Sequence, residues 1–321
     1  MRAARPAVGI LLLIPLSFAA AVYFGSVSFS AQEWSQLLQG QAPDTMRDIL
    51  LQLRLPRAIA AFACGGLLAL AGALLQALLR NPLADPYLLG VSGGASVGAL
   101  SGMLLGMSTV ATHGLSLLGA SAAGLALLLF SCGPGGWQVH RVILSGVAIG
   151  AACGALVALI LSLAPSGELH GMLFWLMGDL STADNAWPAW IVFVLVLTLA
   201  QSLANALDAM VLGELKAASL GMPVRRTQFL AFAAATVATV AAVMLAGAIG
   251  FVGLVVPHLL RLAGINEHRL LLPLSAAGGG VLLVLADTAS RSMAAPLEFP
   301  VGVMTALLGV PILLLLLART R

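Results

Sequence analysis

The chain has 321 residues, of which 60% are hydrophobic and only 8% are charged, and its formal net charge is +3. This composition lies outside the range of soluble proteins and predicts a polytopic membrane protein. Since the hydrocarbon core of a bilayer is about 30 Å thick, nine or ten helical spans would take about 200 residues. Too little chain then remains for a large soluble catalytic or nucleic-acid-binding domain.

Ten apolar segments follow one another along the chain, and we expect each to form a membrane helix. Arg2 and Arg5 before the first segment are typical of a signal peptide, but the further spans favour a retained first helix. The eighth segment is too short to cross alone, so we expect it inside the bundle beside non-helical backbone. The segments are 7–27, 55–79, 87–107, 113–131, 142–163, 188–207, 227–247, 249–260, 270–290 and 301–317.

The basic residues indicate the orientation, because cytoplasmic loops carry an excess of Lys and Arg. Ten spans place both termini on one side. With that side cytoplasmic, the inner basic residues are Arg2, Arg5, Arg80, Arg141, Lys216, Arg225, Arg226, Arg261, Arg269, Arg319 and Arg321. The outer ones are Arg47, Arg54, Arg57 and Arg291. We therefore expect both termini in the cytoplasm.

The outer arginines are the exception to this rule. Arg54, Arg57 and Arg291 stand at span ends, from which a long side chain reaches the interface without any further role. An outer site for acidic residues of a protein partner explains the three arginines better, since complementary charges guide such contacts.

Two connections between spans interrupt the apolar pattern. Pro82 and Pro86 force a non-helical turn between the second and third spans, which we expect to form a fixed cytoplasmic constriction. Segment 212–223 is the longest cytoplasmic loop, and Gly221 and Pro223 indicate a pair of short helices in it. Such a protruding loop suits a socket in a partner protein.

The sequence predicts no catalytic residue, metal site or cofactor. Lys216, the only lysine, is followed by Ala217 and lacks the preceding glycine of a Walker A loop. The cysteines and histidines are scattered, without disulfide or metal-ligand spacing. They are Cys64, Cys132, Cys153, His113, His140, His170, His258 and His268.

Asp287 is the main acid inside a predicted span. It lies four residues before Arg291, so the two side chains share one helix face at ion-pair spacing. We interpret Asp287 as a paired carboxylate near the membrane surface, which makes it a poor proton carrier.

Four motifs, taken in order, resemble the FecCD family of ABC-importer permeases, the membrane subunits of type II importers for cobalamin, haem and ferric siderophores. They are Arg54-Leu-Pro-Arg57, Gln76-(x)4-Asn81-Pro-Leu-Ala, Gly250-Phe-Val-Gly-Leu-(x)2-Pro257-His and Glu298-(x)-Pro-(x)-Gly302. The likeness extends from Trp34 to Pro311. The amino-acid sequences of segments 174–178 and 245–251 are most similar to those of cobalamin permeases.

The resemblance implies an all-α subunit of about ten transmembrane helices with the type II ABC-importer permease fold, in one permease domain over residues 1–321. It further implies a multi-pass protein of the bacterial inner membrane, embedded in the lipid bilayer. Its partners would be a second copy of itself, with the translocation path along the dimer axis, two cytoplasmic ATPase subunits and a periplasmic substrate-binding protein. Nucleic acid is not among the expected partners.

The same resemblance assigns residues to three sites. Docking of the binding protein falls to Arg54, Arg57 and Arg291. Coupling to the ATPase falls to the cytoplasmic loop 208–226, with Gly213, Glu214, Ala217, Leu220 and Gly221. The cytoplasmic gate falls to Asn81, Pro82 and Leu83, together with Val139 and His140, which replace the small hydroxyl residues expected there.

The leading interpretation is the permease subunit of an ATP-driven importer for a large chelated-metal compound, with cobalamin first and haem or a ferric siderophore next. An ion-coupled secondary transporter is an alternative, and it would need Asp287 to titrate during transport. An intramembrane enzyme would need a nucleophile and a base, for which Ser145 and His140 are the nearest pair. Neither alternative explains the loop at 212–223.

Overall fold

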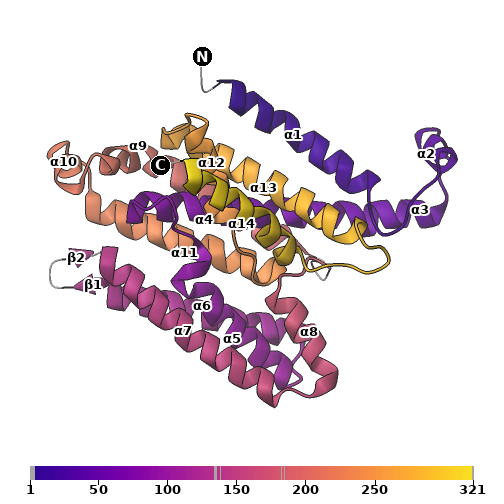
Figure 1. Cartoon of the computed structure of the whole chain (residues 1–321), viewed down its shortest axis with the longest axis horizontal. Coiled ribbons are helices and arrows are strands. Elements are labelled where there is room, and N and C mark those ends of the chain that lie inside the picture. The colour runs from indigo at the N-terminus through magenta and orange to yellow at the C-terminus, as the bar shows by residue number, and fades with distance from the viewer. Residues whose placement is uncertain (1–3, 134–135, 138, 182, 184, 320–321) are drawn as a thin grey trace.

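The computed structural model describes residues 4–133, 136–137, 139–181, 183 and 185–319, and it is a bundle built almost entirely of helices (Figure 1). The α-helices are α1 (Ala4–Tyr23), α2 (Ala31–Leu38), α3 (Asp44–Asp48), α4 (Leu55–Leu79), α5 (Val91–Leu104), α6 (Thr109–Ser131), α7 (Val139–Leu163), α8 (Ser166–Leu176), α9 (Trp187–Val211), α10 (Glu214–Ser219), α11 (Val224–Ala246), α12 (Val252–Leu262), α13 (His268–Ser292) and α14 (Val301–Arg319). A π-helix, η1 (Ile49–Arg54), leads into α4, and a 3-10 helix, η2 (Pro86–Leu89), precedes α5. The short antiparallel strands β1 (Cys132–Gly133) and β2 (Gly136–Trp137) connect α6 to α7.

The prediction of about ten spans is confirmed. Within the described residues, seven helical segments are long and apolar enough to cross a membrane, and three apolar helices are shorter. The long ones are Pro6–Tyr23, Asp44–Leu79, Thr109–Ser131, His140–Leu163, Trp187–Val211, Val224–Ala246 and His268–Ser292. The shorter ones are Val91–Leu104, Val252–Leu262 and Val301–Leu315. Each of the ten predicted segments corresponds to one of these helices.

α12 is the short eighth segment, and its first half lies inside the bundle as expected. Its residues 252–257 are all buried, and it packs against α4 and α13. The backbone before it is not helical, and Gly247 and Phe251 have positive φ angles of 67° and 69°. A positive φ is unusual for a side chain as large as that of phenylalanine, so this junction is held by its surroundings.

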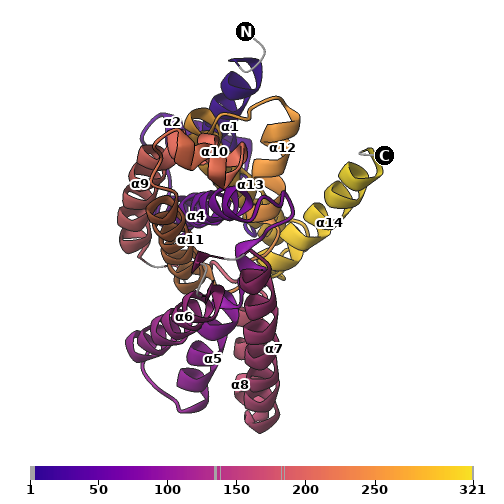
Figure 2. The ribbon, with the colours of Figure 1, turned by 90° about the vertical axis from the view of Figure 1, so that its left-hand side faces the viewer.

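α4 is the central helix of the bundle. Helices α9, α11, α12 and α13 pack around it (Figure 2), and 94% of its most apolar stretch is buried inside the chain. Glycines permit this close approach, as small residues do in many membrane helices. A Cβ atom on Gly65 would collide with the carbonyl oxygen of Gly279 in α13, and one on Gly72 with that of Gly253 in α12.

Helices α5, α6, α7 and α8 form a second group, which lies below the central group in Figure 1. α5 packs against α6 and α7, and it also touches α8. Gly94 in α5 and Gly119 in α6 face each other so closely that a Cβ on either would meet the carbonyl oxygen of the other. η2 and α11 connect this group to the central one.

Several short helices lie outside the predicted spans, namely α2, α3 with η1, and α8. The start of α2 is a capping box, in which Ser30 Oγ accepts from the Glu33 N–H and the Glu33 carboxylate accepts from the Ser30 N–H. The hydrogen bonds that the Ser30 backbone and hydroxyl donate hold the pKa of Glu33 below its ordinary value. This Ser-x-x-Glu pattern is a readable signal for a helix start.

The predicted pair of short helices in segment 212–223 is wrong. One short helix is present, α10, and the chain then turns at Gly221 and enters the long helix α11. Pro223 is not the boundary of a second short helix; it is the N-cap residue of α11.

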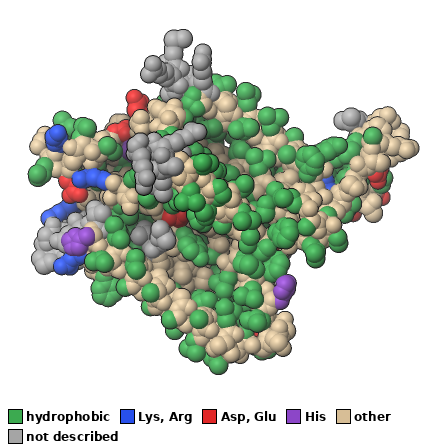
Figure 3. Space-filling model, in the orientation of Figure 1, with side chains coloured by type: hydrophobic (Ala, Val, Ile, Leu, Met, Phe, Trp, Pro, Cys, Tyr) green, Lys and Arg blue, Asp and Glu red, His purple; other side chains and the backbone are tan. Residues whose placement is uncertain are grey.

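The bundle has two distinct ends. α10 lies at the left end of Figure 1, and α2 and α3 lie at the right end. On the face shown in Figure 3, hydrophobic side chains cover the middle, and charged ones gather mainly at the α10 end. α1 begins and α14 ends toward this same α10 end (Figure 1). A membrane would therefore enclose the middle of the bundle and leave the two ends in water.

Candidate docking, coupling and gate sites

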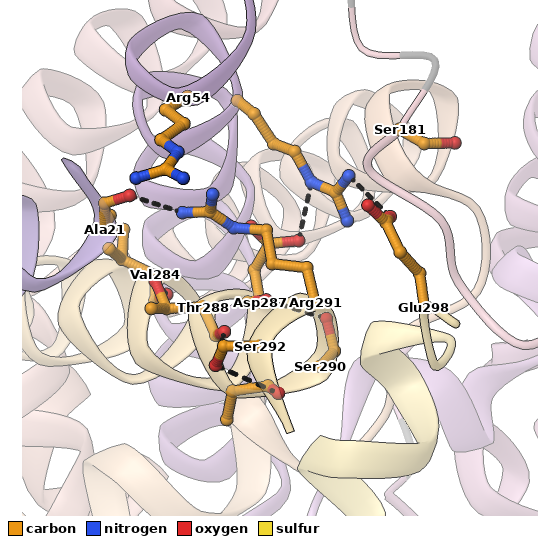
Figure 4. Close-up of polar contacts among 12 residues, drawn as sticks. Ala21, Arg54, Ser181, Val284, Asp287, Thr288, Ser290, Arg291, Ser292 and Glu298 are labelled. Carbon is orange, nitrogen blue, oxygen red and sulfur yellow. Dashed lines mark hydrogen bonds and ion pairs between the residues drawn. The ribbon is translucent and has the colours of Figure 1, made fainter. Parts of the chain in front are cut away.

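The predicted docking arginines gather at one place, where α13 ends and α4 begins (Figure 4). Arg57 is the centre of the cluster, because it bridges two carboxylates. Its Nε donates to Asp287 Oδ1 of α13 at 2.9 Å, and its Nη1 donates to Glu298 Oε2 at 2.9 Å. Glu298 belongs to the loop between α13 and α14. Arg57 thus joins three segments that are distant in the sequence.

Arg291 approaches Asp287 from the same helix. Its Nε lies 3.4 Å from Asp287 Oδ2, an i,i+4 ion pair as the sequence predicts. Its Nη2 donates to the carbonyl oxygen of Ala21 in α1 at 2.6 Å (Figure 4). Asp287 therefore lies between two guanidinium groups, and the interpretation of this residue as a paired carboxylate agrees with the geometry.

Arg54 is the last residue of η1, and its partners are neutral. It donates to the carbonyl oxygens of Val22, Tyr23 and Val27, the first at 2.6 Å. Its guanidinium also lies 5.0 Å from the ring centre of Phe29, a cation–π distance. Arg54 thus attaches the end of α1 to the start of α4.

The cluster carries more positive than negative charge. It contains three arginines but only two carboxylates, those of Asp287 and Glu298, which pair with Arg57 and Arg291. The arginines differ in access, because Arg54 is 3% and Arg291 4% exposed, whereas the Arg57 side chain is 14% and that of Glu298 35% exposed. Of the three arginines, Arg57 is the one that an approaching partner reaches first. The role of all three in docking stays a prediction.

The predicted coupling residues form a protruding turn at the opposite end. Gly213, with a φ of 115°, leads into α10, and Ala217 anchors the helix because it is fully buried. Leu215 and Leu220, at 87% and 62% exposed, point away from the bundle. Exposed leucines on a short helix beyond the spans are typical of a surface that a partner covers.

Gly221 ends α10 with a positive φ of 76°. The N–H of Met222 donates to the Ala217 carbonyl oxygen and that of Gly221 to the Ala218 carbonyl oxygen, the pattern of a Schellman motif. A glycine suits this left-handed position, because other residues adopt it at a cost.

The predicted gate turn follows α4 directly. Asn81 Oδ1 accepts from the Leu83 N–H at 2.9 Å, and the Asn81 carbonyl oxygen accepts from the Ala84 N–H. Pro82 is exposed, and Asn81 and Leu83 are half-buried. The turn is non-helical, as the two prolines predict.

Two buried side chains that the sequence interpretation did not select hold this turn. Gln76 donates to the carbonyl oxygens of Gly253 and Leu254, both at 3.2 Å, and to that of Ala84. Asp85 accepts from the N–H groups of Tyr87 and Phe251 at 2.8 and 3.3 Å.

Burial raises the pKa of Asp85, and the two N–H donors partly offset the effect. Both Gln76 and Asp85 belong to the Gln-(x)4-Asn-Pro-Leu-Ala motif region, so the motif itself was the available signal for them.

The second part of the predicted gate lies at the start of α7. His140 is exposed there, and the side chain of Val139 lies outside the described part of the structure. Among the described residues, no hydrogen bond or ion pair joins His140 to the 81–83 turn. Ser145 and His140, the weak candidate pair for an enzyme, are five residues apart on one helix, about 140° around its axis, so they do not face each other.

Two hollows open beside η2. The larger, of about 750 Å³, lies between η2, α12 and α14, and the smaller, of about 370 Å³, between η2, α5 and α7. Tyr87 and Leu176 line both hollows, so the two are adjacent, and together they are called the groove beside η2. Apart from Asp85, Tyr87 and two serines, its lining is apolar or glycine.

Comparisons with known proteins show which proteins the chain is similar to. The model of the FecCD transport family matches residues 11–319. A vitamin B12 import system permease protein from Salmonella paratyphi A is 40% identical over 273 residues, which cover 84% of this chain and 83% of that protein. The corresponding protein from Escherichia coli is 39% identical over 274 residues, with the same coverage.

Two solved structures are similar as well. One is a metal-chelate type ABC transporter in an inward-facing conformation, with a TM-score of 0.85, 28% identity and 99% coverage of both chains. The other is PsaBC from Streptococcus pneumoniae in complex with Fab, with a TM-score of 0.55, 20% identity and coverage of 89% and 94%. At that identity the second likeness concerns the fold alone.

Proposed function

The chain belongs to the FecCD transport family, and on this premise we propose that it is the membrane-spanning permease subunit of an ATP-driven importer for a large chelated-metal compound. The relatives that are 39–40% identical over 84% of the chain are named as vitamin B12 import permeases. Cobalamin is therefore the first substrate to test, followed by haem and ferric siderophores. ATP hydrolysis belongs to a separate subunit, so this chain is not itself an enzyme.

The observation that carries the proposal is the placement of two unlike surfaces at opposite ends of one apolar bundle. At one end α10 presents exposed leucines beyond the spans, which suits insertion into two cytoplasmic ATPase subunits, one for each copy of the chain. At the other end the arginine cluster has an excess of positive charge, which suits the carboxylates of a periplasmic substrate-binding protein. α1 begins and α14 ends toward the α10 end (Figure 1), which supports cytoplasmic termini in a bacterial inner membrane.

The groove beside η2 supports a homodimer. It is lined mainly by apolar side chains and glycines from α5, α7, α12 and α14, and it is open along one side. A second copy placed against α7 and α14 would close it into a path along the dimer axis. Weak, apolar contact suits a passage, because a tightly bound cargo would leave slowly.

Purification and reconstitution test the proposal. The chain is expressed with candidate ATPase and binding-protein subunits from its own organism, purified, and placed in vesicles with labelled cobalamin, haem or ferric siderophore outside. We expect the ATPase to copurify and uptake to require internal ATP. Uptake without an ATPase subunit, driven by an imposed pH step, would instead favour the ion-coupled secondary transporter and overturn the proposal.

A further inference from the structure

Arg80 and Glu214 form an ion pair that joins the gate turn to the coupling helix. Arg80 Nη2 lies 3.2 Å from Glu214 Oε1, and the two residues are 134 positions apart in the sequence. Arg80 is the residue immediately before Asn81, and Glu214 is the first residue of α10. In the described part of the chain, this is the one hydrogen bond or ion pair between α10 and the 80–85 turn.

The backbone at both partners is held in a defined conformation. Arg80 caps the C-terminus of α4 with a φ of 47°, a left-handed position that is uncommon for a residue other than glycine. Gly213, directly before Glu214, has a φ of 115°. The ion pair therefore joins two turns whose backbones have uncommon conformations, one at the end of α4 and one at the start of α10.

The two partners are anchored differently. The turn after Arg80 is fixed to α12, because Gln76 and Asp85 bind backbone groups of Gly253, Leu254 and Phe251. α10 packs mainly against α9 and α11, and its exposed leucines project outward. A displacement of α10 would thus reach the turn that precedes η2 through one ion pair.

We infer that the Arg80–Glu214 pair transmits displacement of α10 to the Asn81–Leu83 turn, so that ATPase movement acts on the gate through this contact. The inference rests on the proposed function, and it makes Arg80 and Glu214 positioning residues. The side chains are 42% and 43% exposed, so the pair contributes little to the stability of the fold. The pair instead affects the amount of substrate imported per ATP hydrolysed.

Charge reversal tests the pair. In vesicles containing the complete transporter, Arg80→Glu and Glu214→Arg should each raise the ATP consumed per substrate imported by roughly two- to tenfold, since repulsion replaces a surface attraction. The double variant Arg80→Glu/Glu214→Arg should return the ratio to near the wild-type value. Matched controls are Arg269→Glu and Glu267→Arg, exposed charges at the start of α13 and at the same end of the bundle, which should leave the ratio unchanged.

Milder variants distinguish a loss of coupling from a loss of folding. Arg80→Gln and Glu214→Gln should give smaller increases, and Arg80→Lys should keep most of the coupling. Single reversals that transport like the controls, or a double variant no better than the worse single one, would overturn the inference. So would single variants that no longer bind the ATPase, because the pair would then act in assembly. Failure of the proposed function is distinct, since the wild-type chain would then show no ATP-driven uptake at all.

Discussion

Arg57 and Asp287 are 230 positions apart in the sequence, yet Arg57 Nε donates to Asp287 Oδ1 at 2.9 Å at the end of the bundle opposite α10. Asp287 is 1% exposed and also faces Arg291, so one buried carboxylate neutralises parts of two cations. Removing one partner of a buried ion pair is costly, because the remaining charge stays desolvated.

We therefore expect Asp287→Asn to lower the free energy of unfolding by roughly 3–5 kcal/mol, the usual cost of breaking a buried pair. Thermal unfolding of the purified protein in detergent measures this change. Asp48→Asn is the matched control, because Asp48 is an exposed carboxylate at the same end that accepts a hydrogen bond from Gln52. Equal melting temperatures for the two variants would contradict the interpretation of Asp287 as a structural carboxylate.

The same variant tests proton coupling. If Asp287 is a paired carboxylate, uptake by the folded fraction of Asp287→Asn should still follow internal ATP and should ignore an imposed proton gradient. Uptake is measured in vesicles with and without a pH step, and normalised to the amount of folded protein. Loss of a pH-driven uptake that the wild-type chain possesses would show that Asp287 carries protons.

Arg57 should dominate docking of the binding protein, because its side chain, at 14% exposed, is the most accessible of the three arginines. Arg57→Glu is expected to weaken association roughly 30-fold or more, the lower end of the cost of disrupting a desolvated charge pair. Surface plasmon resonance at low and high salt measures this loss. Arg47→Glu is the control, since Arg47 is an exposed arginine of α3 at the same end of the bundle.

Glu298 competes with the partner's carboxylates for Arg57, so Glu298→Gln should tighten the association roughly two- to fivefold, the strength of an exposed ion pair. The same binding assay gives the answer. If Glu298→Gln instead weakens binding as much as Arg57→Glu, Glu298 itself contacts the partner, and the competition argument fails. Variants of Arg54 and Arg291 are less informative, because both side chains are buried and bind α1 or the segment after it.

Gly221→Val should reduce uptake and ATPase stimulation while the chain still folds. A side chain at this position meets no atom within 4 Å, so the penalty is the left-handed backbone conformation alone, about 1–2 kcal/mol. Gly221→Asn should keep most activity, because asparagine tolerates this conformation. Gly114→Val is the control, since Gly114 has equal space around it in the regular helix α6. Normal coupling in Gly221→Val would exclude a role for this turn.

Gly72→Ala should destabilise the bundle, because the added methyl group would meet the Gly253 backbone of α12 and force the two helices apart. Overpacking of this kind costs about 1–3 kcal/mol. Gly154→Ala is expected to stabilise the bundle instead, since nothing lies within 4 Å of that position and alanine favours a helix. Thermal unfolding of both variants separates the two effects, and equal melting temperatures would contradict the close packing of α4 on α12.

The spans were predictable from the sequence, because a bilayer requires apolar helices, and the length of the apolar runs identifies most of them. The long-range pairs were not. Arg57 and Glu298 are 241 positions apart, and nothing in the local pattern near either residue indicates the other. The same holds for Arg80 and Glu214, whose contact depends on where α10 packs. The i,i+4 pair of Asp287 and Arg291 was predictable, since helix geometry alone places them together.

The short helices likewise differ in whether the sequence alone could predict them. α2 has a capping box that can be read from Ser30 and Glu33, whereas α8 begins after Pro165 without a side-chain cap. α10 is six residues long, too short to be stable by itself, so its position depends on packing against α9 and α11. The sequence located the protruding loop but overestimated the number of helices in it.

The buried Gln76 has a consequence for the order in which the chain assembles during synthesis. Two of its three acceptors, the carbonyl oxygens of Gly253 and Leu254, lie 177 and 178 residues further along the chain. At about 5–20 residues per second, a ribosome needs roughly 10–35 s to reach them. During that interval the end of α4 is already synthesised, while its polar amide has only Ala84 nearby among its final partners. The central helix α4 is thus synthesised early, but the hydrogen bonds of its Gln76 can be completed only after α12 has been made.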